Sequence, residues 1–100
     1  MHKILFCLQK LETVTIIAGI VDTKRSEFFQ VMESLKPIIK SYCNDFELKI
    51  AEDNSLAIHI TFDNKNDLKK KFYNKEFNIL KGAVQSLCNN VKVKINEDYI

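Results

Sequence analysis

Residues 13–21 have the sequence TVTIIAGIV, a run of β-branched side chains that favours an extended strand. Alternate residues of a strand face opposite sides. Here both sides are apolar, with Val14, Ile16, Ala18 and Ile20 on one side and Ile17, Gly19 and Val21 on the other. Strands that are apolar on both sides are usually central, so this segment is expected in the middle of a sheet.

The next segment has the spacing of an amphipathic helix. Between residues 26 and 43, apolar side chains recur every three or four positions: Phe28, Val31, Met32, Leu35, Ile38, Ile39 and Tyr42. Pro37 lies inside this stripe and removes one helical hydrogen bond. Because the stripe continues beyond it, we expect Pro37 to bend the helix rather than end it.

Two alternating segments follow, at residues 46–50 and 56–62, joined by the turn residues of 52–54, and they predict a hairpin. A second helical stretch is expected over residues 66–88, with a break near Asn74 between a short helix and a longer one. Residues 91–95 alternate again and predict a last strand. The element order is therefore βαββαβ.

This order predicts an α+β ferredoxin-like sandwich, an antiparallel four-stranded sheet with both helices on one face and strands one and three in the centre. The edge strands would place charged side chains on the uncovered face. The central strands would place there a mostly apolar group of residues: Ile17, Val21, Ala57, His59 and Thr61. An apolar centre with a charged rim predicts a surface that a second copy of the chain covers, so we expect a homodimer; a monomer with a modest apolar patch is the alternative.

Length and composition limit the other possibilities. One hundred residues make one domain, which we place at residues 12–100 after an N-terminal extension at residues 1–11. The net charge of +2 is too small to indicate nucleic-acid or membrane binding. The three cysteines show no paired spacing, which favours reduced thiols in the cytoplasm over disulfides or zinc. No segment approaches the roughly 18–20 apolar residues of a membrane span.

The open face lacks the features of two known uses of this fold. Sheets of this topology that bind RNA carry aromatic side chains on the central strands, whereas none stands at these positions here. Metal-carrying relatives have a Cys-x-x-Cys loop after the first strand, and this chain has Asp22-Thr23-Lys24 instead. We therefore expect neither nucleic acid nor metal as a partner.

The second half of the chain contains a more specific pattern. The segments 62–68 (FDNKNDL), 74–77 (NKEF) and 80–87 (LKGAVQSL) resemble the antibiotic-biosynthesis monooxygenase family. That family has a Trp-acidic-Ser/Asn step after strand three, then Ser-x-x-Phe and a helix with Leu-x-Gly-Ala-x-x-x-Leu. The similarity covers roughly residues 13–97.

The resemblance implies a dimeric α+β barrel, with a cavity between the sheet and the helices of each subunit. It also implies oxidation of quinol-type aromatic compounds by molecular oxygen without a cofactor. A branch of the family binds haem, but the residues that would do so are replaced here: its axial histidine falls at Lys81 and its strand-one asparagine at Ile16. We therefore expect no haem. The family tryptophan falls at Phe62, and a histidine that often precedes Ser-x-x-Phe falls at Lys71.

Site residues follow from the resemblance and the helical spacing together. The expected lining of the cavity is aromatic and apolar with one lysine: Phe28, Ile58, Phe62, Phe72, Phe77, Leu80 and Lys81. No catalytic pair is evident. The weak catalytic candidates are Tyr73, a hydroxyl near the helices, and His59, whose alternation places it on the open face.

Three functions remain open at this stage. The first is a cofactor-independent monooxygenase that acts on a small aromatic or quinol compound. The second is a homodimer of the same fold that binds a small ligand without turning it over. The third is a structural or interaction protein with a filled core.

Overall fold

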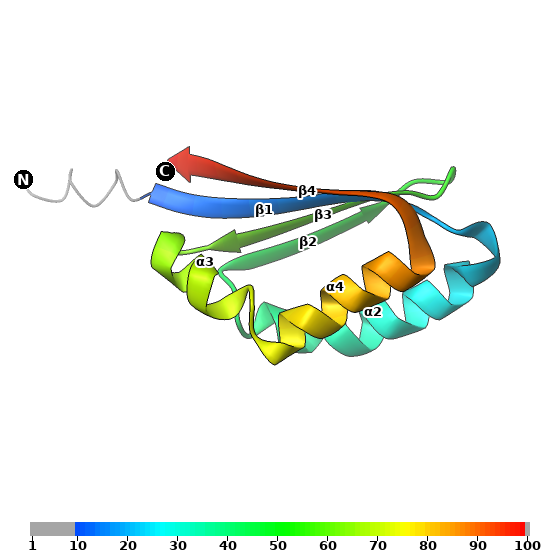
Figure 1. Cartoon of the computed structure of the whole chain (residues 1–100), viewed down its shortest axis with the longest axis horizontal. Coiled ribbons are helices and arrows are strands. Elements are labelled where there is room, and N and C mark those ends of the chain that lie inside the picture. The colour runs from blue at the N-terminus through cyan, green and yellow to red at the C-terminus, as the bar shows by residue number, and fades with distance from the viewer. Residues whose placement is uncertain (1–9, 100) are drawn as a thin grey trace, which may run out of the picture.

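The chain forms one four-stranded antiparallel sheet with helices against one of its faces (Figure 1). The structure, a computed structural model, describes residues 10–99, with side chains within residues 11–95. The strands are β1 (Lys10–Ile20), β2 (Asp45–Ile50), β3 (Ser55–Phe62) and β4 (Cys88–Tyr99). Their order across the sheet is β2-β3-β1-β4, so the predicted ferredoxin-like α+β fold with strands one and three in the centre is confirmed.

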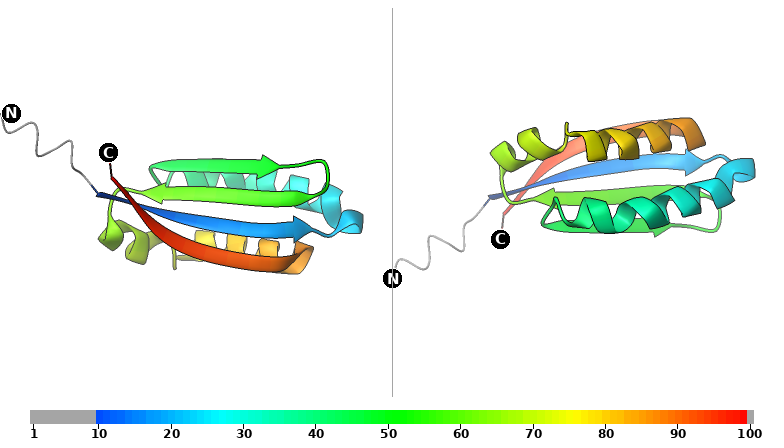
Figure 2. Two further views of the ribbon diagram at one scale, coloured as in Figure 1. Left: turned by 90° about the horizontal axis from the view of Figure 1, so that it is seen from above. Right: turned by 90° about the horizontal axis from the view of Figure 1, so that it is seen from below.

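The helices follow the predicted periodicity. A 3-10 turn, η1 (Asp22–Lys24), leads into α2 (Arg25–Lys40), and the second helical stretch divides into α3 (Lys65–Lys71) and α4 (Lys75–Leu87). All of them cover the same face of the sheet, and the other face is bare of helices (Figure 2). The α2 helix continues through Pro37, as its apolar stripe predicts, and ends at Lys40.

The break between α3 and α4 has a chemical cause. Asn64 and Asn74 are in extended conformation, and each side-chain oxygen accepts a hydrogen bond from the backbone N–H three residues later, which belongs to Asp67 and Phe77 respectively. These are N-cap hydrogen bonds. Each asparagine therefore begins a new helix, so the predicted break near Asn74 is confirmed.

The core lies between the helices and the inner face of the sheet. It is built from one side of β1 and β3 and from the apolar stripes of the helices, and its fully enclosed members are Val14, Ile16, Phe28, Ile39, Leu56, Ile58, Ile60, Phe62, Phe77, Leu80 and Val84. The alternation of buried and less buried residues along β3 is the period-two pattern of a sheet that is covered on one face only.

Two strands are longer than the sequence predicts. β1 begins at Lys10 instead of residue 13, because residues 10–12 pair with the end of β4. β4 begins at Cys88 instead of residue 91, since a register shift between Ile17 and Gly19 lets the strand start directly after α4. Asn90 there has a φ of 53°, a left-handed conformation that asparagine tolerates.

Gly19 allows the irregular pairing beside it. A Cβ at this position would lie 3.0 Å from the Asn89 side-chain oxygen. The absence of a side chain therefore lets the first residues of β4 approach β1. No helix within residues 10–99 is both long and apolar enough to cross a membrane.

Candidate functional site

Three aromatic rings gather under the α3 end of the sheet. Phe62 ends β3, Phe72 follows α3, and Phe77 lies in the first turns of α4. The ring centroids are 6.5 Å apart for Phe62 and Phe72, 5.6 Å for Phe62 and Phe77, and 5.8 Å for Phe72 and Phe77. Tilted and edge-to-face pairs at these distances are favourable aromatic contacts. We call these three residues the aromatic cluster.

The aromatic cluster is closed in this structure. Phe62 and Phe77 are completely enclosed and Phe72 nearly so, and the other predicted apolar lining residues, Phe28, Ile58 and Leu80, are also buried. A planar ligand between two of the rings would need a centroid separation of about 7 Å, twice the contact distance of carbon atoms. Ligand entry would therefore require the cluster to open.

Lys81 is the polar member of the predicted lining. Its ammonium donates a hydrogen bond of 2.9 Å to the Phe72 carbonyl, and lies 4.3 Å from the Phe72 ring centroid and 4.7 Å from that of Tyr73. Partial burial lowers the pKa of Lys81 from its ordinary value. The cation is thus held on the faces of two rings beside the aromatic cluster.

The two catalytic candidates from the sequence lie on opposite sides of the sheet. Tyr73 stands beside the aromatic cluster in the α3–α4 connection, its ring 5.4 Å from that of Phe72, and it is 60% exposed. His59 alternates with the buried Ile58 and Ile60, which places it on the face without helices. The structure does not bring these two residues together.

Glu12 is a potential functional residue that the sequence pattern does not reveal. It is 2% exposed and shares the helix-facing side of β1 with Val14 and Ile16. Its register partner on β3 is Phe62, so the carboxylate stands next to the aromatic cluster. No donor in the described part of the chain hydrogen-bonds its Oε2 atom. A strand that began before residue 13 would have placed Glu12 on the same side as Val14 and Ile16 and so revealed it. The strand predicted from the sequence began at residue 13 and left Glu12 out.

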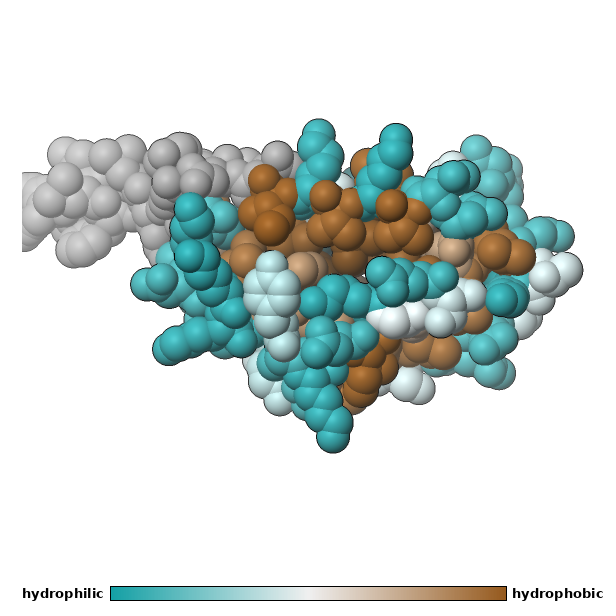
Figure 3. Space-filling model, viewed as in Figure 1, coloured by the Kyte–Doolittle hydropathy of each residue, from teal (hydrophilic) through white to brown (hydrophobic). Residues whose placement is uncertain are grey.

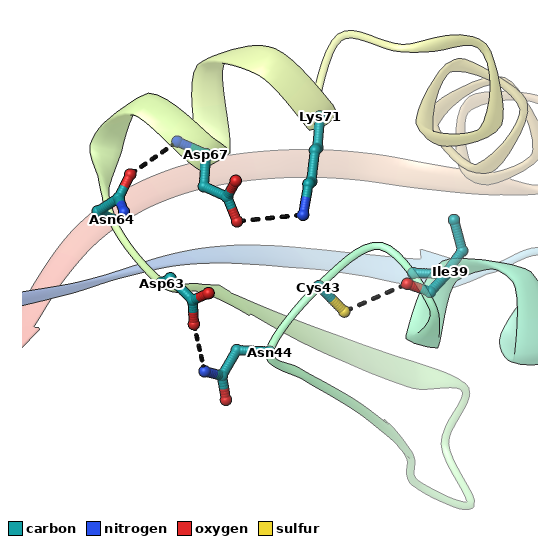
Figure 4. Close-up of polar contacts among 7 residues, drawn as sticks. All are labelled: Ile39, Cys43, Asn44, Asp63, Asn64, Asp67 and Lys71. Atoms are coloured by element: carbon teal, nitrogen blue, oxygen red, sulfur yellow. Dashed lines mark hydrogen bonds and ion pairs between the residues drawn. The ribbon is translucent and has the colours of Figure 1, made fainter.

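The α3 helix packs on the ends of β1 and β3, where Glu12 and Phe62 lie (Figure 1). It buries Leu68, and its outer surface is charged. Figure 4 shows its polar attachments: a 3.2 Å ion pair between Asp67 and Lys71 inside the helix, and a 2.6 Å hydrogen bond that Asn44 donates to Asp63 just before it. A short helix with so few buried side chains is held weakly by comparison with α2 or α4.

The face without helices has an apolar centre and paired polar groups. Ile17 is 47% exposed, and Ala57 lies beside it as its register partner on β3. Thr15 Oγ1 and His59 Nδ1 share a hydrogen bond of 3.1 Å, and the hydroxyls of Thr13 and Thr61 are 3.4 Å apart. We call this surface the open face.

The open face also has a hollow and a charged margin. The hollow has a volume of about 380 Å³ and lies towards the β2–β3 turn, lined by Ile17, Lys49, Ile50, Ala51, Ser55, Leu56 and Ala57. Lys92 pairs in register with Ile17, and Lys94 with Thr15, so both lysines lie along the β4 edge of this face. Val21, predicted on this face, lies just past the end of β1 and donates its backbone N–H to the carbonyl of Leu87 at the end of α4.

A second apolar surface follows β4. Val93 and Ile95 are each 50% exposed, although their register partners Ile16 and Val14 are buried beneath the helices. The helix layer therefore stops short of this edge strand. Figure 3 shows apolar surface gathered along the β4 side of the molecule, below projecting hydrophilic side chains.

In the part of the chain that the structure describes, no group of three or more histidine, cysteine, aspartate or glutamate side chains could hold a metal ion. Cys43 and Cys88 are both free thiols.

Comparisons with known proteins give a likeness in structure only. No protein-family model matches the sequence, and no curated protein matches it. A structure from Caulobacter crescentus, named a putative antibiotic biosynthesis monooxygenase, superposes with a TM-score of 0.74 and 15% identity, covering 100% of this chain and 98% of that one.

Two further solved structures agree with it. One from Nitrosomonas europaea, also named a putative antibiotic biosynthesis monooxygenase, has a TM-score of 0.73 and 8% identity, over 93% of this chain and 91% of that one. One from Bacteroides thetaiotaomicron, described as a possible oxidoreductase, has a TM-score of 0.72 and 14% identity. The match covers 92% of this chain and 99% of that one. The chain therefore has the fold of solved structures that are named putative antibiotic biosynthesis monooxygenases, as the sequence resemblance implies.

Proposed function

We propose that this protein is a cofactor-independent monooxygenase-like enzyme that oxidises a small aromatic or quinol compound. The observation that carries the proposal is the aromatic cluster of Phe62, Phe72 and Phe77, which lies between sheet and helices with polar groups at its margin. Once opened, a site lined by these rings with few polar groups would suit a flat, uncharged ring. Solved structures with this fold include two named putative antibiotic biosynthesis monooxygenases, which supports the proposal.

In this proposal the substrate ring takes a place within the cluster, and Lys81 and Tyr73 contact its polar substituents. Tyr73 belongs to the connection between α3 and α4, and α3 is the element with the fewest buried side chains. Movement of this segment is therefore the proposed route of entry. A closed apolar site would also keep water from reactive oxidation intermediates.

Oxygen uptake tests the catalytic proposal. The protein is incubated with a panel of hydroquinones and naphthoquinols, and oxygen consumption is compared with that of the same solutions without protein. We expect consumption above the background of autoxidation for at least one quinol, and a slower rate for Tyr73→Phe, which loses only the hydroxyl. Uptake equal to the background across the panel would contradict the enzymatic proposal.

The packing of the rings favours a second candidate function. Since the aromatic cluster is closed by its own side chains, the same fold could serve as a homodimer with only a structural role, or as one that opens to bind a small ligand without turning it over. Chemical-shift changes of the Phe62, Phe72 and Phe77 ring protons on addition of an unreactive phenol would separate these roles. Shifts without oxygen uptake support a binding protein, and no shifts support a structural one.

We further propose that the protein works as a homodimer through its open face, in the manner of a dimeric α+β barrel. Ile17 and Ala57 give this face an apolar centre, and the lysines of β4 lie at its margin. Thr15 and His59 already hydrogen-bond each other through Nδ1, so a partner that covers them would have to pair only the Nε2 atom of the imidazole. The free thiols fit a cytoplasmic protein.

A further inference from the structure

We infer that Glu12 is the ligand-recognition group of the proposed site, whose carboxylate accepts a hydrogen bond from the hydroxyl of a hydroxyaromatic ligand. This inference rests on the proposed function and adds to it a residue and the chemical feature that the residue selects. The fold places this carboxylate at a cost in free energy. Glu12 is 2% exposed, and its Oε2 atom finds no hydrogen-bond donor among the described residues.

A buried carboxylate oxygen without a hydrogen-bond partner destabilises a folded protein, because the oxygen loses water and gains no donor in return. The surroundings of Glu12 indicate which kind of ligand could offset this cost. On β1 it is flanked on the same side by Val14, and on β3 its register partner is Phe62, so its surroundings are apolar and aromatic. A ligand that brings both an aromatic ring and a hydrogen-bond donor fits this arrangement.

The charge of Lys81 opposes a cationic ligand, although the Glu12 carboxylate alone would attract one. The ammonium of Lys81 lies over the rings of Phe72 and Tyr73, so a cationic ligand would meet a like charge beside the aromatic cluster. The same ring faces are then not free to hold a second cation. A phenolic hydroxyl avoids this repulsion and still satisfies the carboxylate.

A ligand could reach Glu12 if the α3 helix moved away from the sheet. The α3 helix packs on the ends of β1 and β3 and is bounded by the two cap residues, Asn64 and Asn74. An outward movement of α3 about these ends is the proposed route, and it would leave the α4 cap at Asn74 in place. The ligand would then enter beside Phe72, which directly follows α3.

The test compares three probes that share a ring: phenol, anisole and benzylamine. Anisole lacks the donor hydroxyl and benzylamine carries a positive charge. Calorimetric titration of the full chain should show phenol binding about 10-fold or more tighter than anisole, as expected for a hydrogen bond to a charged group. Glu12→Leu should remove this preference, whereas Glu52→Leu, at an exposed turn position, should keep it.

Thermal unfolding of the ligand-free protein provides a second measurement. Glu12→Leu should melt at a higher temperature than the native protein, because an unpaired buried carboxylate is replaced by an apolar side chain of similar size. A lower melting temperature for both Glu12→Leu and the isosteric Glu12→Gln would show that the carboxylate is a structural group, and would overturn the inference.

The remaining outcomes separate this inference from the proposed function. Equal affinity for phenol and anisole would keep an aromatic site but overturn the role of Glu12. Tighter binding of benzylamine than of phenol would also overturn it, in favour of a cation site. Binding of none of the three probes would overturn the aromatic site and the role of Glu12 together.

Discussion

The ring of Phe77 illustrates how single residues hold this small domain together. It is completely enclosed, and it contacts both other members of the aromatic cluster. A ring in this position contributes through the apolar surface it removes from water and through its contacts with the neighbouring rings. The ring contacts of the aromatic cluster therefore stabilise the fold, independently of any function.

Phe77→Ala should lower the free energy of unfolding by about 3–5 kcal/mol, because the substitution leaves a ring-sized cavity. Phe29→Ala is the matched control, since Phe29 is 42% exposed and contacts Arg25 at the surface. Its cost should be about 1 kcal/mol or less. Urea denaturation followed by circular dichroism measures both, and equal losses would show that the cluster is not part of the core.

Cys43 should make stability depend on pH in the alkaline range. Burial, and secondarily the charge of Asp45, raises the pKa of this thiol from 9.0 to about 11. The fold therefore favours the protonated thiol, and this contribution is complete below pH 9 and is lost as the pH rises through 11. Unfolding free energies measured in steps from pH 8 to pH 11 should fall less steeply for Cys43→Ala. Parallel curves for the two proteins would refute the assignment.

At the scale of elements, α3 and α4 depend on their caps to different degrees. The α4 helix buries four apolar side chains, whereas α3 buries one. Losing a cap should therefore weaken α3 locally and α4 only together with the whole domain. This difference is also what the proposed movement of α3 requires.

Asn64→Ala should speed hydrogen exchange of the α3 amides while leaving those of α4 unchanged, since the cap hydrogen bond to Asp67 is worth about 1 kcal/mol. Asn78→Ala, at an exposed position inside α4, is the control and should change exchange in neither helix. Exchange measured by NMR separates the two helices. Equal acceleration in α3 and α4 would show that the two form one cooperative unit.

The elements were largely predictable from the sequence, because each has a strong period: the stripe of α2, the alternation of β3, and the capping asparagine before α4. The ends of β1 and β4 were not predictable. Their limits depend on pairing between residues 10–12 and residues 97–99, a contact between the two ends of the described chain that no local pattern encodes. The same omission hid Glu12, because it stood outside the predicted strand.

At the scale of the whole molecule, the two faces of the sheet differ in what covers them. The helices close one face, and the open face presents Ile17 at its centre. Sequence alternation could predict which residues share that face. It could not reveal the hollow near the β2–β3 turn, which depends on how Lys49 and Ser55 stand around Ile17 and Ala57.

Ile17→Lys should convert the proposed dimer into a monomer, because it places a charge in the apolar centre of the interface. Ile79→Lys is the matched control: Ile79 is exposed to nearly the same degree, 48% against 47%, but lies on α4. The Ile79→Lys variant should remain dimeric. Sedimentation velocity distinguishes the two states, and a monomeric native protein would refute the dimer.

The pairing of β1 with β4 also determines when the domain can be completed during synthesis. Glu12 pairs with Glu97, so the central strand stays open on one edge until the ribosome has released residues made much later. Before then, β1 can pair only with β3. The backbone N–H and C=O groups on its other edge, which later pair with β4, face water. Contacts between such distant residues form slowly. The nascent chain thus carries an unprotected strand edge until β4 is made, a stage at which a chaperone would be most useful.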